Sequence, residues 1–354
     1  MHKLLTKRVF TTFFIFVCFL SLVACGNKTE NSLDEMQSGS QNNGNLTVIG
    51  FSQLGAESDW RSENTLSMKE TFTEEKGYKL IFEDGQQKQS NQMMAIRKFI
   101  QQEVDYIVLA PVTETGWDNV LIEAKEAGIP VIIVDRMVNV SDDSLYTCWV
   151  GSNFELEGLK VCEWLRQYCD KKRINQNKLR IVDLQGNLES SAQIGRTAGL
   201  EKSARENGWT VLEKVPAEFT QTKGREVMRT LLKKYDDINV VYCENDNEAL
   251  GAIEALEEAG KKIGSNINKG EVMIVSFDGI NSEARKCVTQ DTISCIAECN
   301  PLHGPRVEAI IKLIEDGKTP PKHSYVSEDI YVHDLTVDAI RIKSIEYKTT
   351  ELKE

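Results

Sequence analysis

Short apolar runs alternate with amphipathic stretches along most of the chain after residue 45. Runs such as Tyr106-Ile107-Val108-Leu109-Ala110 and Val131-Ile132-Ile133-Val134 lack polar positions. This pattern is typical of parallel strands that are covered by helices on both faces. The amphipathic stretches between them have helical periodicity, and glycines such as Gly77 and Gly128 mark their ends. We therefore predict an α/β protein built from repeated strand–helix units.

The predicted elements follow directly from this alternation. The strands are predicted at residues 46–51, 79–83, 105–110, 130–134, 146–150, 179–184, 209–215, 238–243, 271–277, 293–298 and 325–332. The helices are predicted at 60–76, 90–102, 116–127, 154–169, 191–207, 221–235, 246–259, 281–289 and 303–316. The alternation breaks at 137–152 and then starts again, and 354 residues are too many for one ordinary core. Two successive doubly wound, Rossmann-like lobes with a cleft between them are expected.

The N-terminus has a different character from the rest. Basic residues up to Arg8 precede an apolar run, Val9 to Val23, which is shorter than the ~20 residues that span a bilayer. The run ends in Leu22-Val23-Ala24-Cys25-Gly26, which resembles the lipobox of bacterial lipoproteins. This resemblance implies a signal peptide at 1–24 and a lipidated Cys25. The polar residues that follow, up to 45, read as a flexible tether.

Charge and composition narrow the choice of function. The formal net charge is −12, and loss of the signal with its three basic residues and no acid leaves −15. Such a chain lacks the clustered Lys and Arg that nucleic acid requires. The sequence contains no nucleophile elbow, no Walker loop and no dinucleotide fingerprint, so we expect neither an enzyme nor a cofactor.

The cysteines raise the question of a metal site. Cys295, Cys299 and His303 are closely spaced, but no fourth ligand lies nearby, so no metal site is predicted. Without Cys18 and Cys25 the number of cysteines is seven, which is odd. At least one must therefore be a free thiol or pair between chains.

Polar and aromatic residues gather where the predicted strands end. Carboxyl ends of parallel strands meet at one cleft, where carboxylates accept hydrogen bonds from hydroxyls and arginines donate them. Any one such carboxylate is equally well explained as a helix cap, as for Asp246, and Asp135-Arg136 as a structural ion pair. The repetition at successive strands favours a neutral, hydroxyl-rich ligand such as a sugar, stacked on aromatic rings. The candidate ligand-binding residues are Gln53, Glu57, Ser58, Trp60, Arg61, Asp135, Arg136, Arg196, Phe219, Asn245, Asp278 and Glu298.

Several of these segments resemble one known family. Gly50-Phe51-Ser52-Gln53-Leu54-Gly55-Ala56-Glu57-Ser58-Asp59-Trp60-Arg61 is similar to the galactofuranose-binding branch of the periplasmic sugar-binding proteins, the ribose/galactose-type solute-binding family of ABC importers. So are Asp84-Gly85-Gln86-Gln87-Lys88-Gln89 and Pro111-Val112-x-x-Thr115-Gly116-Trp117. The resemblance extends over roughly residues 46–335. It implies the type I periplasmic binding protein fold, with three hinge strands near 150–153, 297–301 and 323–327. The lobes would then comprise residues 46–150 with 299–325, and residues 151–298 with 326–354.

The resemblance also implies a function. The protein would capture a monosaccharide, galactofuranose or a related aldose, and present it to an ABC permease, with the candidate residues contacting the sugar from both lobes. We expect a monomer outside the cell membrane, held there only through lipidated Cys25. The alternative is a sensor that reports the sugar to a chemoreceptor or sensor kinase. Asp59, Glu244 and the segment 297–301 depart from the family pattern near the pocket, which bears on the identity of the sugar.

Overall fold

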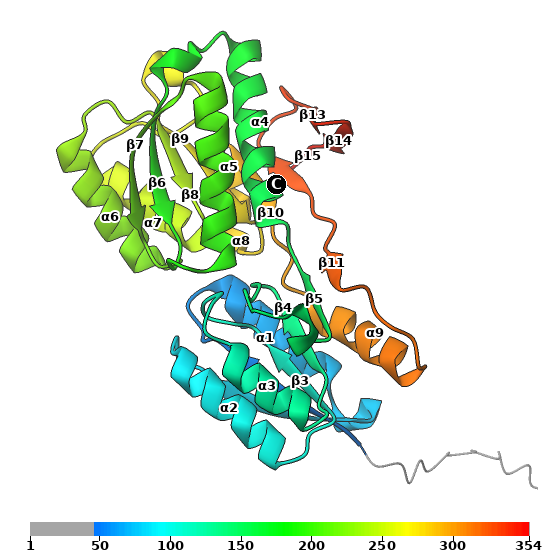
Figure 1. Cartoon of the computed structure of the whole chain (residues 1–354). Helices are drawn as coiled ribbons and strands as arrows, with labels where there is room; N and C mark the ends of the chain where they lie inside the picture. Colours follow the sequence, from blue (N-terminus) through cyan, green and yellow to red (C-terminus); the bar gives the residue numbers. More distant parts are fainter. Residues whose placement is uncertain (1–45, 354) are drawn as a thin grey trace, which may run out of the picture. The chain divides into compact units, whose positions relative to one another are not determined.

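Two mainly parallel β-sheets, each covered by helices on both faces, form the core of the computed structural model (Figure 1). The structure describes residues 46–353, which belong to one compact unit. The predicted signal peptide, Cys25 and the tether lie outside the described residues. Among residues 46–353, no helix has both the length and the apolar character required to cross a bilayer.

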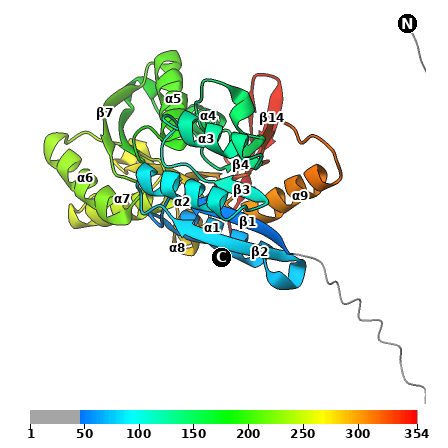
Figure 2. The same ribbon diagram turned by 60° about the horizontal axis from the view of Figure 1, so that its bottom comes forward.

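The first sheet has the strand order β11-β5-β4-β3-β1-β2, and all its neighbouring strands are parallel. Its strands are β1 (Thr47–Gln53), β2 (Tyr78–Asp84), β3 (Tyr106–Leu109), β4 (Val131–Val134), β5 (Cys148–Gly151) and β11 (His323–Tyr325). Its helices are α1 (Asp59–Thr71), α2 (Gln89–Gln101), α3 (Asp118–Glu126) and α9 (His303–Glu315). Successive strand residues point to opposite faces, so Ile107 packs with α2 and α3, whereas Val108 packs with α1 and α9. Figure 2 labels these four helices around the first sheet.

The second sheet has the order β15-β12-β10-β9-β8-β6-β7. Its strands are β6 (Arg180–Gln185), β7 (Thr210–Pro216), β8 (Val240–Cys243), β9 (Met273–Asp278), β10 (Cys295–Glu298), β12 (Ile330–Val332) and β15 (Thr350–Glu351). Helices α4 (Phe154–Lys172) and α5 (Ser191–Asn207) pack on one face. Helices α6 (Gln221–Lys234), α7 (Asp246–Glu258) and α8 (Ser282–Thr289) pack on the other. Only β12, which is antiparallel to β10, interrupts the parallel order.

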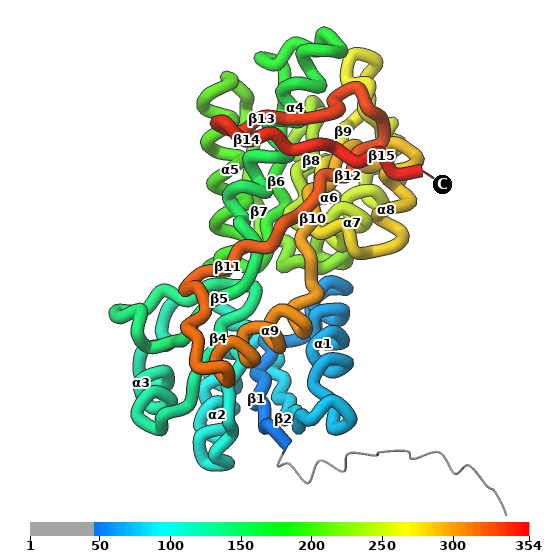
Figure 3. The backbone as a smooth tube through the Cα atoms, turned by 90° about the vertical axis from the view of Figure 1, so that its right-hand side faces the viewer, coloured from blue at the N-terminus to red at the C-terminus, as the bar shows by residue number. Residues whose placement is uncertain are grey.

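The chain passes between the two sheets three times. It leaves the first sheet after β5, returns to it after β10, and leaves it again between β11 and β12, a path that Figure 3 follows. Two doubly wound lobes joined by three connections confirm the predicted fold class. Because strand ends of both sheets adjoin these connections, side chains at those ends can meet.

The last part of the chain differs from the prediction. The single strand expected at 325–332 is two strands, β11 in the first sheet and β12 in the second, because the chain changes sheets within it. Beyond it, β13 (Ala339–Ile342) and β14 (Ile345–Lys348) form a hairpin that the sequence pattern did not indicate. Ile340 and Tyr347 of this hairpin pack with the core beside α4, so the hairpin extends the second lobe.

The seven cysteines of the described part of the chain are free and buried. They lie in strands, helices or the connection after β10, and most pack as small apolar side chains.

Candidate functional site

A cavity with about 290 Å³ of empty space, part of it open to solvent, lies where strand ends of the two sheets adjoin. Its lining comes from both lobes and contains every candidate ligand-binding residue except Gln53 and Glu298. The lining residues are Glu57, Ser58, Trp60, Arg61, Asp135, Arg136, Phe154, Ala192, Arg196, Phe219, Asn245, Asp278 and Cys299.

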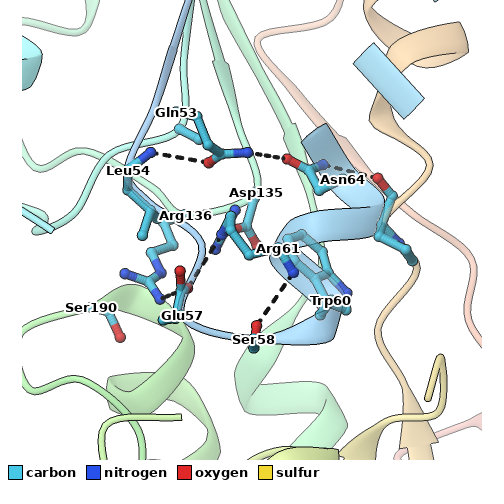
Figure 4. Close-up of polar contacts among 12 residues, drawn as sticks. Gln53, Leu54, Glu57, Ser58, Trp60, Arg61, Asn64, Asp135, Arg136 and Ser190 are labelled. Carbon is cyan, nitrogen blue, oxygen red and sulfur yellow. Dashed lines mark hydrogen bonds and ion pairs between the residues drawn. The ribbon is translucent and has the colours of Figure 1, made fainter. Parts of the chain in front are cut away.

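The start of helix α1 positions the first group of side chains. Ser58 caps the helix by accepting a hydrogen bond from the Arg61 amide, 3.3 Å away. Arg61 reaches back to Glu57, with Nε 3.2 Å from Oε1, and across to Asp135, with Nη2 2.6 Å from Oδ2 (Figure 4). These three side chains are almost fully shielded from solvent. A capped helix terminus thus holds a buried Glu–Arg–Asp chain against the end of β4.

Arg136 extends this chain toward the second lobe. Its Nη2 lies 3.2 Å from Glu57 Oε1, and its Nη1 donates to the Val112 carbonyl. The guanidinium carbon is 5.4 Å from the centre of the Phe219 ring, within cation–π range. One carboxylate, Glu57, therefore holds two guanidinium groups, and the second of them contacts an aromatic ring from the other lobe.

The second lobe repeats this chemistry around Arg196. Arg196 Nε lies 2.8 Å from Glu157 Oε2, and its Nη2 lies 3.1 Å from Asp278 Oδ1. Asn245 caps helix α7 through its Oδ1 and donates from Nδ2 to the Phe219 carbonyl, 3.0 Å away. The caps of both helices thus carry side chains that line the cavity.

Several lining residues have left-handed backbone conformations. The φ angles of Asp135, Phe219 and Asp278 are 61°, 60° and 89°. Such conformations cost about 1–3 kcal/mol for residues other than glycine, and they cluster at functional sites. The Phe219 ring also requires a neighbour without a side chain, because a Cβ on Gly186 would lie 1.9 Å from its Cζ. These backbone conformations direct the side chains of Asp135, Phe219 and Asp278 toward the cavity.

Burial and pairing set the ionisation of these groups. Burial opposes the charge on Asp135, but Arg61 and Arg136 outweigh it and keep its pKa below the ordinary value. Burial dominates at Asp278, whose pKa rises to about 7 in spite of Arg196. Burial also lowers the pKa of Arg136 to about 10. The arginines remain cationic at neutral pH, whereas Asp278 titrates near it.

The lining contains as many carboxyl groups as guanidinium groups, and some of its donors have no partner. Three carboxylates, Glu57, Asp135 and Asp278, face three guanidinium groups. Among residues 46–353, the buried atoms Arg61 Nη1 and Arg136 Nε have no hydrogen-bond partner. Buried donors without partners are costly unless a ligand supplies acceptors. The arrangement suits a neutral ligand with many oxygen atoms.

Two candidate residues lie outside the cavity. Gln53, the last residue of β1, donates from Nε2 to Asn64 Oδ1 at 3.0 Å and so fastens β1 to α1. Glu298 accepts hydrogen bonds from Asn300 and from the Asp329 amide, which joins two of the connections between the sheets. Both terminate strands, as expected, but their side chains turn into the protein.

Three lining residues were not predicted. These are Phe154, Ala192 and Cys299. Phe154 and Ala192 are apolar, so the pattern of polar residues at strand ends does not indicate them. Phe154 could have been found from its position directly after the Asn153 cap of α4. The spacing of Cys299 from Cys295 and His303 marks it as a candidate metal ligand, not as part of a sugar site.

Contacts across the cavity mouth connect the two lobes. The Asp59 amide and carboxylate bond to the side-chain amide of Asn247, each at 3.2 Å, and Asp59 also accepts from Asn281 Nδ2. Trp60 Nε1 donates to the Cys299 carbonyl at 2.6 Å. The first turn of α1 is thus bonded both to the second lobe and to the connection after β10, as expected for a closed arrangement.

Comparison with known proteins gives a consistent result. Residues 49–301 match the periplasmic binding protein domain family. Over 301 residues the chain is 36% identical to the galactofuranose-binding protein YtfQ of Escherichia coli (strain K12), covering 84% of this chain and 91% of that protein.

Solved structures show the same likeness. A crystal structure from Mycobacterium smegmatis in complex with beta-D-fucofuranose superposes with a TM-score of 0.76 at 35% identity, over 82% of this chain and 93% of that one. The binding protein of the arabinose ABC transporter from Shewanella sp. ANA-3, bound to alpha- and beta-L-arabinofuranose, gives a TM-score of 0.74 at 38% identity, over 82% and 93%.

Proposed function

Because the chain belongs to the periplasmic binding protein domain family, we propose that it captures a monosaccharide in its furanose form and delivers it to an ABC importer. The protein performs no chemistry on the sugar. The ligand occupies the cavity between the lobes and is released at the permease when the lobes separate. Contacts that exist only in the closed form drive closure.

The observation that carries the proposal is the ring of paired ions with free donors around a small cavity. Carboxylates and guanidinium groups in fixed pairs present both acceptors and donors. A sugar hydroxyl both donates and accepts, so it can bridge the members of such a pair. Hydrogen bonds to charged groups contribute about 1.5–3 kcal/mol each. Several of them explain how one hydroxyl pattern is selected from similar ones.

The relatives favour the five-membered ring. The names of the Escherichia coli protein and of the two solved structures refer to galactofuranose, fucofuranose and arabinofuranose. A furanose ring is flatter than a pyranose chair and carries part of its hydroxyls on an exocyclic chain. Such a ring suits a cavity whose walls include the Trp60 and Phe219 rings. Galactofuranose is the leading candidate because of the identity to YtfQ.

Calorimetric titration with locked ring forms tests this proposal. Methyl glycosides cannot open, so methyl galactofuranoside and methyl galactopyranoside present fixed ring sizes. We expect one-to-one binding of the furanoside, together with galactose and L-arabinose, and at least 100-fold weaker binding of the pyranoside. Preference for the pyranoside would overturn the furanose assignment. No heat with any aldose would overturn the sugar assignment, and continuing turnover would indicate an enzyme.

The role in transport requires a test in cells. Deletion of the gene should abolish uptake of the radiolabelled sugar that titrates the purified protein. Normal uptake combined with loss of a sugar-dependent transcriptional response would instead indicate a sensor. We also propose that Cys25 carries a lipid anchor on the outer face of the membrane, supported by the sequence Leu22-Val23-Ala24-Cys25-Gly26. Cys25→Ala should prevent incorporation of an alkyne fatty acid and release the protein into the medium.

A further inference from the structure

A second group of chemically reactive side chains lies among the connections between the sheets. Cys299 follows β10, Glu328 lies between β11 and β12, and Glu157 is in the first turn of α4. The Cys299 sulfur and one carboxylate oxygen from each glutamate lie within 4.8 Å of one another. Glu157 and Cys299 are 1% and 2% exposed, and Glu328 is partly buried. We call these three residues the hinge cluster.

One oxygen of the hinge cluster has no hydrogen-bond partner. Glu157 uses Oε2 to accept from Arg196, whereas its buried Oε1 is unpartnered among the described residues. A buried carboxylate oxygen without a partner is costly, even though Arg196 balances the charge of the group. The same carboxylate supplies the oxygen that lies within 4.8 Å of the Cys299 sulfur and of a Glu328 oxygen.

Ser152 brings a fourth donor atom into the hinge cluster. Its Oγ lies 3.3 Å from Cys299 Sγ and 2.5 Å from Glu328 Oε1, which also accepts from the Asn300 amide at 2.9 Å. The serine hydroxyl can thus complete a set of four ligands or hold a ligating carboxylate in place.

We propose that the hinge cluster binds one divalent metal ion of the zinc type, held by Cys299, Glu157 and Glu328 with Ser152 or water in the fourth position. Thiolate sulfur and carboxylate oxygen are both regular zinc ligands. Hard ions such as Mg²⁺ and Ca²⁺ avoid sulfur, so the thiol selects against them. Tetrahedral zinc separates its ligand atoms by roughly 3.3–3.8 Å, which small side-chain rotations from the observed cluster would achieve.

A metal ion could reach the hinge cluster through the cavity, and its binding would link segments of both connections. Cys299 lines the sugar cavity as well as the hinge cluster, so the open cavity gives access to it. The ligands come from α4 and from two of the three connections, so a bound ion would tie these segments together. Glu157 also holds Arg196 of the cavity at 2.8 Å. Metal binding therefore stiffens the connections directly behind the sugar site.

A proton is the competing occupant. Burial raises the pKa of Glu328 to about 8, and it raises the pKa of the Cys299 thiol as well. An ion that binds here has to displace the protons of these two groups.

Cobalt titration of the sugar-free full chain, after dialysis against a chelator, tests the proposal. Co²⁺ reports a thiolate ligand through a sulfur-to-metal charge-transfer band. We expect a band that saturates at one ion per chain and disappears when one equivalent of Zn²⁺ is added. Cys299→Ser should remove the band, and Glu328→Gln should weaken Co²⁺ binding at least tenfold.

Cys162→Ser is the matched control, since Cys162 is an equally buried thiol in α4 that lies outside the hinge cluster. Its band should match that of the unaltered chain. The absence of a thiolate band in the unaltered chain would overturn the proposal, whatever bands the variants show. The hinge cluster would then hold protons and no metal ion. A band that persists in Cys299→Ser would assign the ion to another cysteine. Because no sugar is present, the outcome is independent of the proposed transport function.

Discussion

Arg61 Nη2 lies 2.6 Å from Asp135 Oδ2, and this ion pair joins the first turn of α1 to the residue that follows β4. Both side chains are at most 4% exposed, so neither charge has water as an alternative partner. The pair also sets the direction of the remaining Arg61 nitrogen, Nη1, which has no partner in the described part of the chain. The same side chain thus forms a buried ion pair and keeps one donor without a partner.

Removal of Arg61 should therefore affect both folding and binding. Arg61→Ala leaves Asp135 buried without its counter-ion, which costs about 3–5 kcal/mol of the free energy of unfolding. We expect sugar affinity to fall at least 100-fold. Urea unfolding and calorimetry measure the two effects. Arg97→Ala is the control, because its pair with Glu123 is exposed and should contribute little to stability. Unchanged sugar affinity in Arg61→Ala would contradict a role in the site.

A methyl group on Gly186 should displace an aromatic wall of the cavity. The Cβ of Gly186→Ala would lie 1.9 Å from Phe219 Cζ, so the ring must move. We expect a 10- to 100-fold loss of sugar affinity. Calorimetry of Gly186→Ala beside Gly260→Ala, a surface glycine with no neighbour near its Cβ, separates displacement of the ring from general strain. Equal affinities of the two variants would show that the Phe219 ring does not touch the sugar.

Asp59 should act on the lifetime of the closed form. Its contacts with Asn247 and Asn281 cross from the first lobe to the second, but Asp59 does not line the cavity. Asp59→Ala should accelerate sugar dissociation about 3- to 30-fold and leave the preference among sugars unchanged. Stopped-flow measurement of release tests this. Asp316→Ala removes an exposed carboxylate that contacts only Lys318 nearby and serves as the charge-matched control. A changed order of sugar preference in Asp59→Ala would place Asp59 in the site itself.

The free energy of unfolding should decrease as the pH rises, and Glu244 should account for part of the decrease. Burial raises the pKa of Glu244 to about 8, so the folded protein keeps a proton that the unfolded chain releases near pH 4.5. The resulting stabilisation is complete below pH 4.5 and is lost as the pH rises toward 8. Glu244→Gln cannot ionise, so its free energy of unfolding should fall less, by up to a few kcal/mol, between pH 5 and 8.5.

Urea unfolding at several pH values measures this difference. Glu226→Gln, which replaces an exposed carboxylate in the same lobe, is the control. Parallel pH profiles of the Glu244→Gln variant and the unaltered chain would mean that Glu244 stays ionised in the fold.

The sequence predicted the strand–helix order because buried parallel strands leave an unbroken apolar pattern, as in Val131-Ile132-Ile133-Val134. It missed the hairpin β13–β14, whose strands are short and mixed in polarity. Strand ends located most of the cavity lining, but they could not distinguish Asp135, which faces the cavity, from Gln53, which turns back to Asn64. Whether a side chain at a strand end faces the cavity depends on the side of the chain on which the next helix packs. The sequence pattern does not show that side, and the folded structure does.

The equal numbers of carboxylates and guanidinium groups around the cavity have an electrical consequence. A neutral sugar enters without a counter-ion, so its dissociation constant should hardly vary with ionic strength. A uronic acid would leave one charge unmatched, and a phosphorylated sugar up to about two. We therefore expect the cavity to bind a neutral sugar in preference to its phosphorylated form.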